Sequence, residues 1–178
     1  MPDKAPDSST SPAMAAAEPP HRRQQIALED ISNPMIRQGL DLWLCQRGER
    51  LFPAREDMTP RHMKSLLRNA VLIRVRDCGE EFEVRIIGDS IVQAQGANFR
   101  GLTTRDIDAR LAGYGTTLRR IYQEACATKA PLALRGWFQR AADKRSFFHE
   151  SLVLPLGKDD GAVDHLLTLA VYANEQGG

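Results

Sequence analysis

The fold is decided by residues 70–88, AVLIRVRDCGEEFEVRIIG. Two runs rich in β-branched residues, 70–77 and 81–88, flank a short turn that contains Gly79. Alternation of side chains with a period of two is typical of strands, and two strands joined by so short a turn must run in opposite directions. This stretch therefore predicts an antiparallel β-hairpin.

The chain after the hairpin first becomes helical and then returns to strands. Residues 89–128 give short helical pieces interrupted by Gly96 and Gly101, followed by a longer helix from about Tyr114. Consecutive hairpins without βαβ alternation favour an antiparallel sheet. We predict a mixed α+β fold with a five-stranded antiparallel sheet and helices packed against one face. The last three strands are expected in residues 131–140, 146–157 and 164–173.

Before the hairpin, residues 33–48 predict an additional N-terminal helix. Asn33 can cap it, Pro34 suits its first turn, and Gly48 closes it. A second, shorter helix is expected in residues 59–69. The apolar stripe of the first helix must cover the open side of the sheet or pair with a second copy of the chain. We hypothesise a homodimer through this stripe, with the candidate residues Ile36, Leu40, Trp43 and Leu44.

Composition limits the domain organisation. Residues 1–25 are rich in Pro, Ser and Ala and contain no aromatic residue, so we expect a disordered tail. Residues 26–174 then form a single domain with an N-terminal helical extension.

The charge and cysteine content exclude few partners but favour some classes over others. The 24 Lys and Arg nearly balance the 23 Asp and Glu, which gives no reason to expect nucleic acid as a partner. The three cysteines form no C-x-x-C pair, and no metal site is expected. No apolar run is long enough for membrane insertion, so we expect a cytoplasmic protein.

Three separated segments carry a family resemblance. The first is L-W-x-x-x-R-G-x-R-x-x-P-A-R-x-D, the second F-x-x-R-x-x-G and the third G-x-x-x-x-G. They resemble a bacterial stand-alone subfamily of PAS domains, over about residues 35–110. The resemblance implies a sensory or interaction domain rather than a catalyst, and it supplies no ligand. The residues are Leu42, Trp43, Arg47, Gly48, Arg50, Pro53, Ala54, Arg55, Asp57, Phe82, Arg85, Gly88, Gly96 and Gly101.

The cofactor question centres on QGANFRGL, residues 95–102. This loop resembles the G-x-N-C-R-F-L loop of light-sensing flavoproteins, but Phe99 stands where those proteins carry the reactive cysteine. We therefore expect no flavin adduct, whereas noncovalent flavin stays open. Haem would need a histidine ligand facing the cavity, and His149 is the candidate because it lies inside a predicted strand, whereas His165 stands at a strand start. We do not expect haem, and the cofactor stays unknown.

Arg85 stands on the second strand of the hairpin. Phe82, Val84 and Ile86 share the apolar face, so strict alternation places Arg85 on the other face, with Ile87. We expect a solvated or salt-bridged arginine, or one that anchors an acidic group. Most aromatic side chains are expected to fill the core, and a minority to line a pocket. The candidate pocket residues are Arg85, Ile86, Phe99, Tyr122, Trp137 and His149.

The function predicted first is a PAS-like sensory or regulatory module. It would act through an unidentified signalling protein partner or through rearrangement of a homodimer. The alternatives are a sensor that holds a small-molecule metabolite in the cavity, and a small cavity enzyme of the isomerase or hydratase type with Glu150 or Asp89 as base. No nucleophile or metal motif supports catalysis, so we expect a protein that is not an enzyme and assign no catalytic residue.

Overall fold

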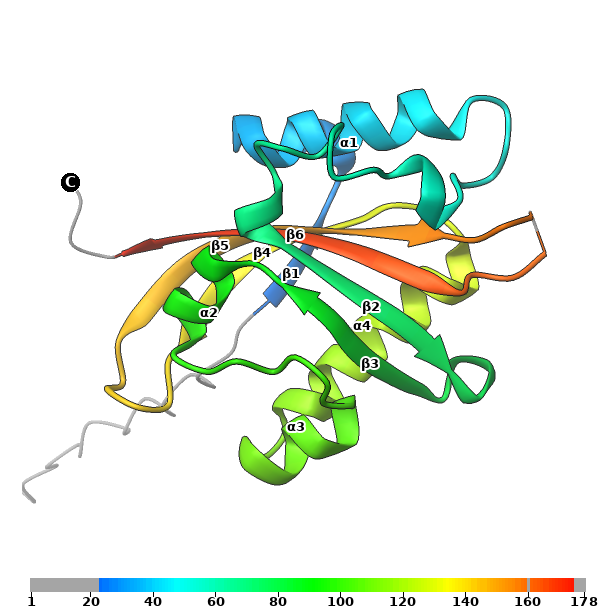
Figure 1. The fold of residues 1–178 in the computed structure, drawn as a ribbon. Coiled ribbons are helices and arrows are strands. Elements are labelled where there is room, and N and C mark those ends of the chain that lie inside the picture. Colours follow the sequence, from blue (N-terminus) through cyan, green and yellow to red (C-terminus); the bar gives the residue numbers. More distant parts are fainter. Residues whose placement is uncertain (1–22, 160, 175–178) are drawn as a thin grey trace, which may run out of the picture.

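A computed structural model describes residues 23–159 and 161–174. It contains a six-stranded antiparallel sheet in the order β1-β4-β5-β6-β2-β3, with helices on both faces (Figure 1). The α+β architecture with an antiparallel sheet is confirmed. The strands are β1 (Arg23–Ile26), β2 (Ala70–Arg76), β3 (Glu81–Ile87), β4 (Leu132–Gln139), β5 (Ser146–Leu156) and β6 (His165–Asn174), and the helices are α1 (Pro34–Arg47), α2 (Asp89–Gln95), α3 (Thr104–Arg110) and α4 (Tyr114–Thr128).

The sixth strand, β1, was not predicted. It pairs with β4 at the edge of the sheet, with Arg23 opposite Gly136 and Ile26 opposite Ala133. Three of its residues, 23–25, fall within the expected disordered tail, which the sequence predicts from the Pro-, Ser- and Ala-rich composition of residues 1–25. A short edge strand needs backbone pairing more than apolar alternation, and composition does not reveal this. Residues 1–22 of the expected tail lie outside the described residues.

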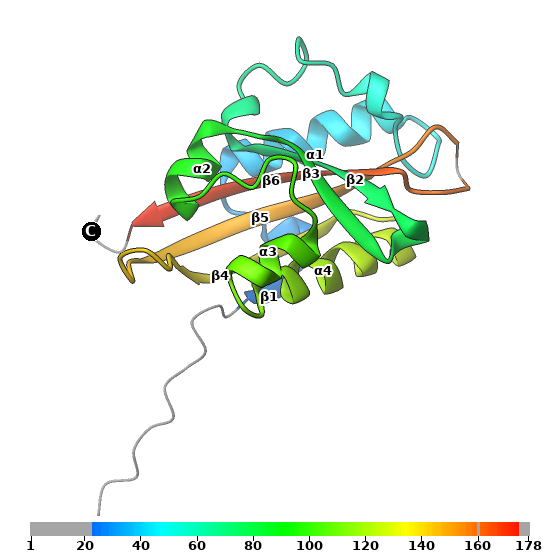
Figure 2. The same cartoon turned by 60° about the horizontal axis from the view of Figure 1, so that its bottom comes forward.

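The two faces of the sheet carry separate cores. Helices α2, α3 and α4 lie on one side, which we call the inner face, and α1 lies on the other side, the outer face (Figures 1 and 2). The expectation that helices cover one face holds for α2–α4, while α1 covers the opposite face by itself. Gly39 makes this close approach possible, because an added Cβ would lie 2.0 Å from Leu169 Cδ1.

The helix α1 has the ends that the sequence predicts. Asn33 Oδ1 accepts hydrogen bonds from Met35 N at 2.9 Å and Ile36 N at 3.4 Å, which satisfies two free backbone donors. Trp43 is fully buried, and its Nε1 donates to Pro155 O at 2.8 Å. These contacts fix α1 across β5 and β6.

The second predicted N-terminal helix, residues 59–69, is wrong as a continuous helix. The segment forms successive turns and a 3-10 helix at Leu67–Asn69. Both Met63 and Leu66 are buried against the sheet. Packing of these two side chains replaces the hydrogen-bond ladder that a helix of this length would need.

The hairpin contains a β-bulge at Arg85. Leu72 pairs with Ile86, and Ile73 pairs with Val84, so Arg85 has no partner on β2. Because a bulge shifts the alternation by one residue, Ile87 lies with Val84 on the inner face and Ile86 lies on the outer face. The prediction that Ile86 shares a face with Phe82 and Val84 is therefore wrong.

The loop between α2 and α3 changes direction at two glycines. Gly96 ends α2 with φ of 69°, and Gly101 has φ of 82°, in the region that favours glycine. Phe99 between them is 4% exposed and packs in the inner core. Within residues 23–159 and 161–174, no helix has the length and apolar character needed to cross a membrane.

Candidate functional site

The inner core encloses a small cavity between the sheet and helices α2–α4. Its volume is about 50 Å³. A site for one water needs roughly 10–15 Å³ in this measure, so the cavity has room for about three or four heavy atoms. A flavin or haem ring system would require its wall to move. Its walls are mostly apolar, and its polar lining residues are Arg23, Gln95, Tyr114, Tyr122, His149, Ser151, Thr168 and Tyr172.

Arg23 brings a positive charge to this cavity. It lies on β1, at the sheet edge, and its Nη2 donates to Tyr114 Oη at 3.3 Å. The guanidinium carbon lies 5.3 Å from the centre of the Tyr114 ring, in a cation–π contact. The Nε atom is buried without a hydrogen-bond partner, and no carboxylate among the described residues forms an ion pair with Arg23. Among the described residues, the groups that contact the guanidinium are neutral, and the Arg23 side chain as a whole is partly exposed.

Gln95 links the hydroxyl groups around Arg23. Its Nε2 donates to Tyr114 Oη at 3.0 Å and to Tyr172 Oη at 3.2 Å. Its Oε1 is buried and has no donor. The end of α2 thus contributes one satisfied amide nitrogen and one unsatisfied carbonyl oxygen to the polar side of the cavity.

Tyr122 and Tyr172, two of the tyrosines that line the cavity, stay neutral. Burial raises the pKa of Tyr122 and of Tyr172 well above the ordinary value, and the nearby guanidinium opposes this only in part. Neither hydroxyl can therefore serve as a counter-ion near neutral pH. The positive charge of Arg23 has no balancing negative charge from these groups.

The structure divides the six candidate pocket residues between three places. Phe99, Tyr122 and His149 line the inner cavity. The bulge places Arg85 and Ile86 on the outer face of β3, where they line a different pocket. Trp137 is 40% exposed on β4 and packs edge-to-face against Phe148, with ring centres 5.4 Å apart.

Sequence reasoning missed six of the eight polar lining residues, and three of these six, Arg23, Gln95 and Tyr172, belong to the hydrogen-bond network around Tyr114. Arg23 was assigned to the tail, and Gln95 ends a short helix whose orientation depends on packing. Tyr172 could have been found, because alternation along the last strand places it on the same face as Ala170 and Thr168. Arg23 and Gln95 had no periodic signal in the sequence.

His149 lies on the inner face of β5. Its Nδ1 is 2.9 Å from Gly136 O, and its ring lies 5.8 Å from that of Tyr172. A protonated Nδ1 that donates to this carbonyl is the tautomer consistent with the contact. Within the part of the chain that the structure describes, no group of three or more His, Cys, Asp or Glu side chains is placed to hold a metal ion.

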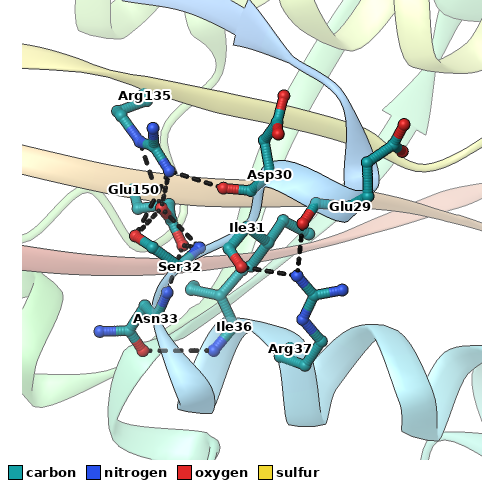
Figure 3. A network of polar contacts seen from close by, with 9 residues as sticks. All are labelled: Glu29, Asp30, Ile31, Ser32, Asn33, Ile36, Arg37, Arg135 and Glu150. Atoms are coloured by element: carbon teal, nitrogen blue, oxygen red, sulfur yellow. Dashed lines mark hydrogen bonds and ion pairs between the residues drawn. The ribbon is translucent and has the colours of Figure 1, made fainter.

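Glu150, next in the chain, points to the outer face and anchors the start of α1 (Figure 3). Its carboxylate accepts hydrogen bonds from Asn33 N at 2.8 Å, from Ser32 Oγ at 2.8 Å and from Arg135 Nη2 at 2.9 Å. Burial opposes ionisation, but the bonds from Asn33, Arg135 and Ser32 outweigh it and lower the pKa of Glu150. This carboxylate is committed to joining β5, β4 and the segment before α1.

This arrangement bears on the alternative of a cavity enzyme. A general base must reach a substrate proton with a free oxygen. Glu150 faces away from the inner cavity and is surrounded by donors, and Asp89 is exposed in the first turn of α2. Neither residue lines the cavity.

The four residues proposed for a dimer differ in exposure. Ile36, Leu40 and Trp43 are buried against the sheet of the same chain, whereas Leu44 is 41% exposed. Of the two uses considered for the apolar stripe, the structure shows that it covers the sheet. The homodimer stays a prediction, and of these residues only Leu44 offers it an exposed side chain.

Comparison with solved structures gives neighbours of low identity. The PAS domain of BvgS from Bordetella pertussis is 12% identical, covers 65% of this chain and 87% of that chain, and has a TM-score of 0.48. A light-oxygen-voltage protein of Rhodobacter sphaeroides is 14% identical over 67% and 71% of the two chains, with a TM-score of 0.46. An RNA-binding light-oxygen-voltage receptor is 14% identical with a TM-score of 0.47, and the match covers 68% of this chain but 34% of the receptor.

The family model gives the decisive comparison. A search of curated proteins gave no match. The family model described as PAS domain matches residues 32–171, which include β2–β5, most of β6 and the helices α1–α4. The chain therefore belongs to the PAS domain family, as the three sequence segments predict.

Proposed function

We propose that this PAS domain is a sensory module that binds a small anion in the inner cavity beside Arg23. The observation that supports the proposal is a buried guanidinium nitrogen that has neither an acceptor nor a carboxylate partner among the described residues. Burying a charge without a partner is costly, and an anion in the cavity would remove that cost.

Charge and size define the class of ligand. The guanidinium of Arg23 favours a carboxylate or another planar anion that accepts from its nitrogens. The hydroxyl groups of Tyr114 and Tyr172 lie beside it and can donate to a bound oxygen. With about 50 Å³ available, formate and acetate are the carboxylates that fit without displacement of the wall.

The position of Arg23 suggests how occupancy would reach the surface. β1 has only four residues and pairs with β4 alone. It is followed by a 3-10 helix at Leu28–Asp30 and then by the Glu150 network that begins α1. An anion bound to Arg23 would stabilise the position of β1 on β4. A shift of β1 would then move the segment that leads into α1. A protein partner or a second copy that contacts the exposed side of α1, including Leu44, would detect this change.

The test is anion-dependent stability of the purified protein. Formate or acetate should raise the unfolding midpoint of the protein with increasing concentration, because a ligand that binds only the folded state stabilises it. The neutral analogues formamide and acetamide should not. Arg23→Gln should lose the response, whereas the control Arg120→Gln, which changes an exposed arginine of α4, should keep it.

Two results would overturn the proposal. One is an equal midpoint shift by acetate and acetamide at matched ionic strength. The other is an undiminished acetate response in Arg23→Gln. Amide chemical shifts of Gln95 and Tyr172 during the formate titration place the binding event, since both residues line the cavity.

A further inference from the structure

The helix α1 leaves one part of the outer face uncovered. It packs on β5 and β6, while β2 and β3 extend beyond it (Figure 1). On this uncovered part lie Leu72 and Ile86, which face each other across the β2–β3 pair. Ile86 is 50% exposed. An apolar pair at the bulge is therefore open to solvent next to the segment 55–67.

An apolar pocket is built around this pair. Its volume is about 330 Å³, which lies within the range of roughly 300–1,000 Å³ for small-molecule sites. The side chains that form its apolar wall are Met58, Met63, Leu67, Leu72, Ile86 and Leu167. The pocket lies on the opposite face of the sheet from Arg23 and the inner cavity.

A basic pocket of about 420 Å³ adjoins the apolar one. The two share Arg55, Leu72 and Ile86, so they form one continuous groove. The basic side is lined by Arg55, Arg74, Arg85, Arg100 and His165. This groove, apolar at one end and basic at the other, is called the outer groove below.

Among the described residues, three of the four arginines of the outer groove form no ion pair, while one carboxylate, Glu56, also lines its apolar end. Arg85 pairs with Glu83 at 2.5 Å, and Arg76 pairs with the same carboxylate at 3.1 Å. These bonds lower the pKa of Glu83, so that carboxylate is fully used. Among the described residues, no ion pair involves Arg55, Arg74 or Arg100.

We propose that the outer groove binds a phosphate-bearing amphiphile. Its apolar body would fill the pocket around Leu72 and Ile86, and Arg55, Arg74 and Arg100 would hold its phosphate. A phosphate monoester carries nearly two negative charges at neutral pH, which matches three unpaired cations better than one carboxylate does. One such molecule covers the exposed apolar pair and neutralises the arginines together.

The probe is octyl phosphate, used below the concentration at which it forms micelles. Isothermal titration calorimetry would compare it with octanol, inorganic phosphate and octanoate. Because each pocket contributes part of the affinity, octyl phosphate should bind about tenfold or more tightly than any of the other three. Binding of octyl phosphate no tighter than that of octanol or octanoate would overturn the proposal.

Variants locate the site. The double variant Arg74→Gln/Arg100→Gln should weaken octyl phosphate binding by about tenfold or more, because two charged donors are lost. Ile86→Ser should weaken octyl phosphate binding but not phosphate binding. Arg120→Gln is the control and should bind as the unaltered protein does. All four side chains are exposed, so circular dichroism should show a native fold in each variant. An unchanged affinity in the double variant contradicts the proposal.

Two further experiments identify the kind of ligand and separate the outer groove from the inner cavity. Sedimentation with vesicles that contain phosphatidic acid, against vesicles of neutral lipid, tests whether a membrane lipid can supply the phosphate. If the protein binds the acidic vesicles, a membrane lipid can supply the phosphate. If it binds octyl phosphate but not the vesicles, the ligand is a free amphiphile. Both outcomes support binding in the outer groove. Arg23→Gln should leave octyl phosphate binding unchanged, so failure of either proposal is visible without the other.

Discussion

The two faces of the same sheet differ in how completely their cores are filled. Beneath α1 the outer face is filled by apolar side chains, and two of its polar groups have partners: Trp43 Nε1 donates to Pro155 O, and Glu150 accepts from four donor groups. At the end of α1, Arg47 Nε is buried without a hydrogen-bond partner among the described residues. On the inner face a cavity of about 50 Å³ persists, and Arg23 and Gln95 each keep a buried polar atom without a partner. An unpaired buried polar atom is costly, so the inner layer carries a cost around its cavity that the packing beneath α1 largely avoids.

The first prediction compares how tightly the two faces are packed, and it has the largest expected change in stability. Trp43→Ala should lower the free energy of unfolding by about 3–5 kcal/mol, because it opens a cavity in a filled core. It also removes the donor to Pro155 O. Phe99→Ala should cost less, since Phe99 already borders a cavity. Urea unfolding measures both, with Trp43→Phe as the control that keeps most of the volume. A larger loss in Phe99→Ala than in Trp43→Ala would break the comparison.

The next effect concerns the anchor of α1. Glu150→Gln keeps the shape of the side chain but replaces an oxygen that accepts charge-assisted bonds with an amide that donates. We expect a loss of about 1–3 kcal/mol in the free energy of unfolding. Hydrogen exchange should show faster opening at residues 32–36 than in the unaltered protein. Unchanged exchange at these amides would mean that Glu150 does not hold the start of α1.

The lowered pKa of Glu150 also predicts acid sensitivity. A carboxyl group whose pKa is lower in the folded chain adds stability above its unfolded value of about 4.3. That stability is lost as the pH falls through the lower folded pKa. Urea unfolding from about pH 6 to about pH 3 should therefore show a smaller loss in Glu150→Gln than in the unaltered protein. Equal pH slopes would contradict the direction of the Glu150 shift.

The smallest effect has the opposite sign. Arg23→Met removes a buried charge that lacks a carboxylate partner, so without added anion the variant should be as stable as the unaltered protein or more stable by about 1 kcal/mol. Tyr114 loses one hydrogen bond in exchange. A clear loss of stability in anion-free buffer would show that the contacts of Arg23 stabilise the folded chain, as those of Glu150 do.

The antiparallel sheet and most of its strands could be predicted from the sequence alone. Alternating β-branched runs predict β2–β3 and the strands β4, β5 and β6, because alternation is a local property of each segment. The stripe of Ile36, Leu40 and Trp43 likewise predicts a helix with one buried side. Within the cavity, the stripe of the helix from Tyr114 predicts Tyr122, a place inside a strand predicts His149, and the resemblance of residues 95–102 to the flavoprotein loop points to Phe99.

The face of the sheet on which a side chain lies, and the distant residues that it contacts, became clear only from the folded structure. The bulge at Arg85 moved Ile86 to the outer face, and β1 brought Arg23 across the chain to Tyr114. A bulge and an edge-strand pairing depend on contacts between segments distant in sequence, so neither leaves a periodic signal in its own residues. The α1 stripe could cover a sheet or a second copy with the same apolar pattern, because burial lowers the free energy in both cases. In the structure the stripe covers β5 and β6 of the same chain.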